Sequence, residues 1–187
     1  VPLKLEAFES AFIIFRRNSD KSAETDITAN FPDPQVLSEL TGPWAVTFDT
    51  AKRGPAKPVV FASLQDWTTS CNDSIKYYSG TAFYKTSFTL QDVDLKNALF
   101  MDLGIVKVMA KVKLNGKDVG GVWTAPWKLD ISAAVKAGEN ILEVEVVNNW
   151  VNRLIGDSKL PETERKTWCN VNPFKPVSTL DPSGLIG

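Results

Sequence analysis

Alternation of apolar and polar residues is the main pattern along the chain. From Val106 to Leu114 every second residue is apolar, and three of the four residues between them are lysines. Asn115-Gly116 follows at once and is the strongest short signal for a β-hairpin, because both central positions of a type I′ turn need φ > 0. The sequence therefore predicts a strand with one apolar and one basic face, ending in a tight hairpin.

A second alternating segment carries acidic residues on its polar face. Leu142, Val144 and Val146 alternate with Glu143 and Glu145. If this strand lies beside the lysine-bearing strand, the two charged rows can pair across the ladder, each pair contributing about 0.2–1 kcal/mol. Similar patterns predict further strands at Ala7–Arg16, Trp44–Phe48, Val59–Ser63, Thr81–Leu90 and Leu99–Leu103.

Helical signals are few. Only Asp130–Gly138 is typical of a capped helical segment, of one or two turns, with Asp130 or Ser132 as N-cap and Gly138 as the stop. The polar segment 18–35 and the glycine- and proline-containing segment 51–58 predict loops. Short strands joined by turn residues indicate an all-β fold, an antiparallel β-sandwich of the jelly-roll type, over the single domain 1–187.

Composition restricts the possible chemistry. The chain has 187 residues, a net charge of −1 and no histidine. Without histidine, Ser-His-Asp and Cys-His catalysis and His-ligated metals are excluded, and the near-zero charge argues against a nucleic-acid partner. We found none of the motifs for a hydrolase nucleophile, a phosphate loop or a dinucleotide fold, and no EF-hand spacing. The sequence thus predicts no catalytic residue, no metal and no cofactor.

The ends and the cysteines add limited information. The longest apolar run, Ala11–Phe15, is too short to cross a membrane, and the opening residues do not resemble a signal peptide. Because the chain does not begin with Met, we expect a processed product or a piece excised from a longer protein, and we favour the excised piece. Cys71 and Cys169 are either one disulfide or two buried free thiols.

Two groups of residues are candidates for binding. Trp123 and Trp127 lie between strands, where an indole can pack against the C–H face of a sugar or, alternatively, close the end of the sandwich. The segment Asn148–Asp157 follows a buried strand and is expected to gather polar side chains at one end of the sandwich. Arg153 and Asp157 there can bind a ligand or form a structural ion pair. The candidate carbohydrate-binding residues are Trp123, Trp127, Asn149, Asn152, Arg153 and Asp157.

Several segments together resemble glycoside hydrolases. Tyr78–Phe88 is similar to the SGTAxYxxxF segment of sugar-binding domains in family 2-type enzymes, and Leu114–Gly120, Trp123–Ile131 and Gly138–Leu142 continue that pattern in order. Trp150–Asp157 resembles the C-terminal region of family 106 enzymes, which are α-L-rhamnosidase-like. Two further segments fit the same region, Glu9–Arg16 and Pro182–Gly187.

The resemblance implies a galactose-binding-like jelly roll that is a non-catalytic accessory domain of a secreted or periplasmic bacterial enzyme. The expected partners are the catalytic barrel of the same polypeptide, or a plant-type, rhamnose-containing polysaccharide. A (β/α)₈ barrel takes roughly 250 residues, so this chain cannot contain it. Two alternatives stay open: an autonomous carbohydrate-binding module, and a structural scaffold with no glycan ligand.

Overall fold

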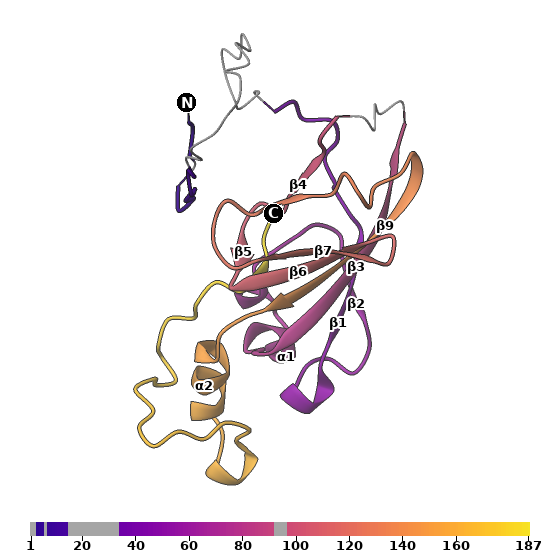
Figure 1. The fold of residues 1–187 in the computed structure, drawn as a ribbon. Helices are drawn as coiled ribbons and strands as arrows, with labels where there is room; N and C mark the ends of the chain where they lie inside the picture. Colours follow the sequence, from indigo (N-terminus) through magenta and orange to yellow (C-terminus); the bar gives the residue numbers. More distant parts are fainter. Residues whose placement is uncertain (1–2, 6, 15–33, 92–96) are drawn as a thin grey trace.

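The computed structural model describes residues 3–5, 7–14, 34–91 and 97–187. Most regular structure is β, arranged around one large antiparallel sheet of six strands in the order β2-β1-β3-β9-β6-β7 (Figure 1). These strands are β1 (Trp44–Phe48), β2 (Val59–Phe61), β3 (Thr81–Leu90), β6 (Met109–Leu114), β7 (Lys117–Val122) and β9 (Gly138–Val147). The all-β fold class expected from the alternating pattern is confirmed.

Two short ladders and a few helical turns complete the fold. One ladder joins β5 (Val106–Lys107) to β10 (Gly184–Leu185), and the other joins β4 (Phe100–Asp102) to β8 (Lys128–Asp130). The helical elements are α1 (Asp73–Lys76), α2 (Val151–Ser158) and the 3-10 turns η1 (Thr50–Lys52), η2 (Trp67–Thr69) and η3 (Glu162–Glu164). In Figure 1, α2 and the segment after it extend beyond the end of the large sheet.

The core lies on one face of the large sheet, as the alternation predicts. Val112, Leu142, Val144 and Val146 are at most 1% exposed, and they contribute to one continuous cluster with the two short ladders. An edge-to-face aromatic group fills the end of this core near η2; its members are Phe48, Phe61, Trp67, Tyr78 and Tyr84. Apolar burial of this extent is the main stabilising contribution to the fold.

The hairpin and the charged rows form as expected. Asn115 (φ 53°) and Gly116 (φ 78°) both adopt positive φ, which is the conformation of a type I′ turn. Strands β6 and β9 are neighbours, with Lys111 opposite Glu145 and Lys113 opposite Glu143. The ion pair of Glu143, however, is with Lys85 on β3, at 3.1 Å.

Some sequence predictions differ from the structure. No strand forms within residues 7–14, whose side chains are exposed, and Arg16 lies outside the described residues, as does most of the predicted loop 18–35. At Asp130–Gly138 the predicted capped turn forms, since Asp130 accepts hydrogen bonds from the N–H and hydroxyl of Ser132 and the carbonyl of Ile131 accepts from the N–H of Val135, but Gly138 begins β9 instead of ending a helix. The predicted strand from Val106 is interrupted at Val108, so that β5 pairs with β10 while β6 pairs with β9.

The cysteines match neither alternative expected from the sequence. Cys71 is exposed and Cys169 is partly buried, and both are free thiols. No disulfide therefore connects them, and they do not act as two buried core residues.

Candidate functional site

The polar segment after β9 is a helix rather than a loop, and it buries its polar side chains. Asn152, Arg153 and Asp157 lie on one side of α2 and are at most 7% exposed. The spacing of four residues places Arg153 and Asp157 on the same face of a helix, with Asn152 next to Arg153 along the chain. The sequence predicted their proximity correctly, but not the helix that produces it.

Arg153 and Asp157 form a buried ion pair. Arg153 Nε lies 2.9 Å from a carboxylate oxygen of Asp157, and their side chains are only 8% and 2% exposed. The other carboxylate oxygen of Asp157 accepts hydrogen bonds from the N–H of Lys166 and from the N–H and hydroxyl of Thr167, each at 2.8 Å. Burial raises the pKa of Asp157, but these hydrogen bonds and the charge of Arg153 outweigh it and hold the pKa below its usual value.

The asparagines connect α2 and β9 to the end of the chain. Asn152 donates to the carbonyl of Asp181 and to the hydroxyl of Ser183, and its own carbonyl accepts from the N–H of Asp181. Asn149 donates to the carboxylate of Asp181, and Asn148 donates to Ser183. We call these bonds, together with those of Asp157, the C-terminal network. Its members hydrogen-bond to one another, which supports a structural role; sugar binding by these residues stays a prediction.

The two candidate tryptophans lie in different environments. Trp127 is half-buried against the core, and its carbonyl accepts from the N–H of Leu103. Trp123, just after β7, is 71% exposed. Of the two expected roles, Trp127 therefore fits the packing role and Trp123 fits contact with a partner.

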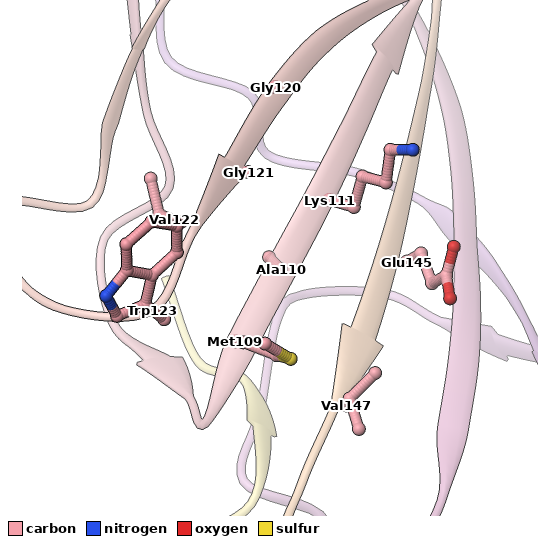
Figure 2. A pocket seen from close by; sticks show the side chains of 9 residues that line it. All are labelled: Met109, Ala110, Lys111, Gly120, Gly121, Val122, Trp123, Glu145 and Val147. Carbon is pink, nitrogen blue, oxygen red and sulfur yellow. The ribbon is translucent and has the colours of Figure 1, made fainter.

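Trp123 borders a hollow on the exposed face of the large sheet (Figure 2). The hollow has a volume of about 320 Å³ and lies over the ends of β6, β7 and β9. Met109 and Val147, which are directly opposite each other on β6 and β9, supply apolar surface. On β7, Gly120 and Gly121 leave the backbone uncovered beside the indole.

Charged groups border the same hollow. Lys111 on β6 is paired with Asp118 at 2.8 Å and lies opposite Glu145 on β9. The hydrogen bond with Asp118, followed by its charge, raises the pKa of Lys111, and the same hydrogen bond lowers the pKa of Asp118. The hollow thus combines an aromatic wall with a hydrogen-bond donor and a hydrogen-bond acceptor.

Of the six candidates, the structure brings together the four polar residues of the network and leaves both tryptophans apart from them. Sequence reasoning missed Met109, Lys111, Glu145 and Val147 as neighbours of Trp123. The outward positions of the two alternating strands, together with Gly120-Gly121, were the signal that could have found them. Within residues 3–5, 7–14, 34–91 and 97–187, no group of His, Cys, Asp or Glu could hold a metal ion, and no helix is long and apolar enough to span a membrane.

Comparison with known proteins shows relatives among glycoside hydrolases. Residues 65–176 match the family model described as "Glycosyl hydrolase 2 galactose-binding domain-like". A curated protein of Formosa agariphila named "Putative beta-glucuronidase" is 50% identical over 136 residues, which are 71% of this chain and 12% of that protein.

Solved structures agree with this match. A rhamnosidase from Novosphingobium sp. PP1Y is 37% identical, with a TM-score of 0.79 over 89% of this chain and 16% of that one. A β-glucuronidase from an uncultured Clostridium sp. is 19% identical, with a TM-score of 0.52 over 63% of this chain and 24% of that one, and shares the fold. The chain therefore spans less than a quarter of each relative.

Proposed function

Because the chain belongs to the family of glycosyl hydrolase 2 galactose-binding-like domains, we propose that it is a non-catalytic accessory domain that packs against the catalytic barrel of a glycoside hydrolase. The observation that carries the proposal is the similarity of 89% of this chain to only 16% of a rhamnosidase. In a protein of that size, a catalytic domain has room outside the matched region. The catalytic carboxylates of the parent enzyme then lie outside these 187 residues.

For the reaction of the parent enzyme we propose hydrolysis of α-L-rhamnosides, in an enzyme of the family 106 type with this domain in its C-terminal region. The support is the 37% identity to the rhamnosidase over nearly the whole chain, and the resemblance of Trp150–Asp157 to family 106. The 50% identical relative carries a different name, so β-glucuronide hydrolysis is the second candidate. Since polysaccharides are too large to enter a bacterial cell intact, we also place the parent enzyme in the periplasm or outside the cell.

For the surface that packs on the barrel we propose the side of the molecule formed by α2 and the segment after it. Trp150, Trp168, Val171 and Val177 are between 62% and 91% exposed there. Exposed large apolar residues on a soluble domain are typical of a protein–protein contact. The C-terminal network fixes the segment that carries them, through the bonds of Asp157 to Lys166 and Thr167.

The reaction is tested with the full-length polypeptide and two chromogenic substrates, p-nitrophenyl α-L-rhamnopyranoside and p-nitrophenyl β-D-glucuronide. We expect p-nitrophenol release from the rhamnoside by the full-length protein and no release by the 187-residue chain. Release from the glucuronide alone would support the second candidate. Release by the 187-residue chain, abolished by a single Asp or Glu substitution, would contradict the accessory role.

The packing surface is tested by calorimetry of the full-length protein. We expect the double variant Trp150→Ser, Trp168→Ser to separate the unfolding of this domain from that of the rest, giving two transitions in place of one. Trp123→Ser is the matched control, because it removes an equally exposed indole from another side of the domain. Unchanged, coupled unfolding in the double variant would contradict this choice of surface.

A further inference from the structure

The hollow beside Trp123 is held open by the backbone. Gly121 lies so close to β6 that a Cβ there would come within 2.8 Å of the carbonyl oxygen of Ala110, and Gly120 has a φ of 107°. Both positions therefore favour glycine for reasons of geometry. A Cβ on Gly120 would point to Leu129 on the core side, whereas Gly121 lies opposite Lys111 on the exposed side, so it is Gly121 that leaves the strip between Trp123 and Lys111 without a side chain.

The polar groups of the hollow restrict the chemistry of a ligand. Lys111 can only donate hydrogen bonds, and the carboxylate of Glu145 can only accept them. Within the described part of the chain, the Glu145 carboxylate has no hydrogen-bond or ion-pair partner, although it lies opposite Lys111 and is attracted by its charge. A hydroxyl group both accepts and donates, so neighbouring hydroxyls on one ring satisfy both residues.

The aromatic wall restricts the shape of that ligand. The indole of Trp123 and the side chains of Met109 and Val147 offer apolar surface to a ring with a C–H face. The volume of about 320 Å³ lies at the lower end of the range of small-molecule sites, about 300–1,000 Å³. A ligand of one or two sugar rings fits this volume, whereas a folded protein partner needs a much larger surface.

The balance of charge indicates a neutral ligand. Asp118 already neutralises Lys111, and Glu145 adds a negative charge on the opposite side. A sugar carboxylate therefore gains little from Lys111 and is repelled by Glu145.

We propose that this hollow is a binding site for a neutral pyranoside, in which Trp123 stacks on the ring, Lys111 donates to a hydroxyl and Glu145 accepts from one. The proposal deepens the proposed function, on which it rests for its setting within a carbohydrate-active enzyme. It places glycan contact on the exposed face of the sheet, away from the polar residues of α2.

The test uses the indole N–H signals of the ¹⁵N-labelled 187-residue chain, with Trp123 assigned from the signal missing in Trp123→Ala. The probes are methyl α-L-rhamnopyranoside, methyl β-D-galactopyranoside and methyl β-D-glucuronide. We expect at least one neutral glycoside to shift the Trp123 signal saturably at millimolar concentrations, and the glucuronide to bind several-fold more weakly. The proposal is overturned if neither neutral glycoside shifts the Trp123 signal at concentrations up to about 100 mM, because any binding would then be too weak to be useful.

Two variants and one control locate the site. Trp123→Ala should bind the glycoside about tenfold more weakly or worse, because it lacks the stacking indole. Tryptophan fluorescence or calorimetry measures the affinity. Glu145→Gln keeps the shape of the side chain and removes its charge. We expect this variant to bind the neutral glycoside more weakly, and the ratio of its affinities for the neutral glycoside and the glucuronide to be smaller than in the original chain. Trp168→Ala, which removes another exposed indole, should leave the affinity unchanged. Equal binding by Trp123→Ala would overturn the proposal.

The outcome is separate from that of the proposed function. Sugar binding is measured on this chain alone, and hydrolysis is measured on the full-length polypeptide. A full-length enzyme that cleaves rhamnosides while the Trp123 signal stays unmoved would refute the sugar site only. If the 187-residue chain binds the glycoside but the full-length polypeptide hydrolyses neither substrate, only the proposed enzymatic reaction is refuted.

Discussion

The C-terminal network and the hollow beside Trp123 both contain a basic and an acidic residue, but they use them differently. In the network, Arg153 and Asp157 are almost completely buried, and Asp157 also accepts hydrogen bonds from Lys166 and Thr167. At the hollow, Lys111 and Glu145 face solvent beside an exposed indole. The first arrangement holds the chain together, whereas in the second Lys111 pairs with Asp118 at the surface and the Glu145 carboxylate stays open to solvent.

The comparison shows that a dense polar run in the sequence can fix segments of the chain to one another. The segment Asn148–Asp157 is the richest polar run of the chain, and its side chains are used to attach the C-terminal segment to β9 and α2. The residues around Trp123 are scattered over three strands, and only the sheet brings them together. The predictions below test whether this division between a structural region and an open region holds.

The largest effect is expected at the buried ion pair. Asp157→Ala leaves the Arg153 guanidinium buried without its counter-charge and frees three donors, so we expect a loss of about 3–5 kcal/mol in the free energy of unfolding. Urea denaturation followed by tryptophan fluorescence measures it. Asp118→Ala is the control, because it removes an exposed ion pair with Lys111, and it should leave the midpoint nearly unchanged. Equal losses in both variants would contradict the comparison.

The second effect appears at alkaline pH and concerns the tyrosine that holds the C-terminal strand. Burial raises the pKa of Tyr84 to about 12, although hydrogen bonds with the N–H groups of Leu185 and Trp67 act in the opposite direction. Because the folded pKa lies above the unfolded value of about 10, the stabilisation is complete below pH 10 and is lost as the pH rises through 12. We expect the free energy of unfolding to fall by about 3 kcal/mol over this window.

Urea denaturation at pH 9 to 12 measures this fall. Tyr84→Phe, which cannot ionise, should lack the part of the fall that Tyr84 causes. An identical pH dependence in the variant and the original chain would exclude this tyrosine as its source.

A smaller effect is expected for the same substitution at neutral pH. The Tyr84 hydroxyl accepts from the indole N–H of Trp67 at 2.6 Å and from the N–H of Leu185 at 3.4 Å. Tyr84→Phe leaves both donors buried without an acceptor, which should cost about 1–3 kcal/mol at pH 7. Thermal or urea unfolding measures it. Tyr77→Phe loses a hydrogen bond from the exposed Lys159, so it should lose less free energy of unfolding than Tyr84→Phe. A larger loss in Tyr77→Phe would contradict the stabilising role assigned to the Tyr84 hydroxyl.

The smallest effect is expected at the hollow. Trp123 is 71% exposed, so Trp123→Ala should change the free energy of unfolding by no more than about 0.5 kcal/mol. The same urea titration measures it at pH 7. A loss of several kcal/mol would mean that Trp123 is part of the core, and the open region would then not differ from the network in its role.

Local patterns predicted much of the fold. Trp44–Phe48 and Thr81–Leu90 are strands with the predicted bounds, because the two-residue period of their apolar side chains matches a sheet buried on one face. Asn115-Gly116 forms the predicted turn for the equally local reason that few residue pairs tolerate two positive φ values. Residues 7–14 have similar apolar content but form no strand, because no neighbouring strand pairs with them in the described structure.

The candidate site was less predictable. Trp123 could be chosen from the sequence because a tryptophan between strands is unusual, but its exposure and the half-burial of Trp127 depend on distant parts of the chain. Glu145 and Lys111 are 34 positions apart, and their proximity depends on the order of strands in the sheet. The helix α2 was missed because its first residues, Val151 and Asn152, have low helix propensity, and the bonds that hold it come from residues 166–183.

The sequence by itself determined the class of the protein: period-two alternation and turn residues specify an antiparallel β fold, and the ordered motifs indicate a domain of a glycoside hydrolase. Only the tertiary structure decided how the polar residues are used. Burial converts Arg153 and Asp157 into part of the framework, because charged groups removed from water must satisfy each other. Lys111 and Glu145 stay on the open face of the sheet, where water, and by our proposal a sugar, can reach them.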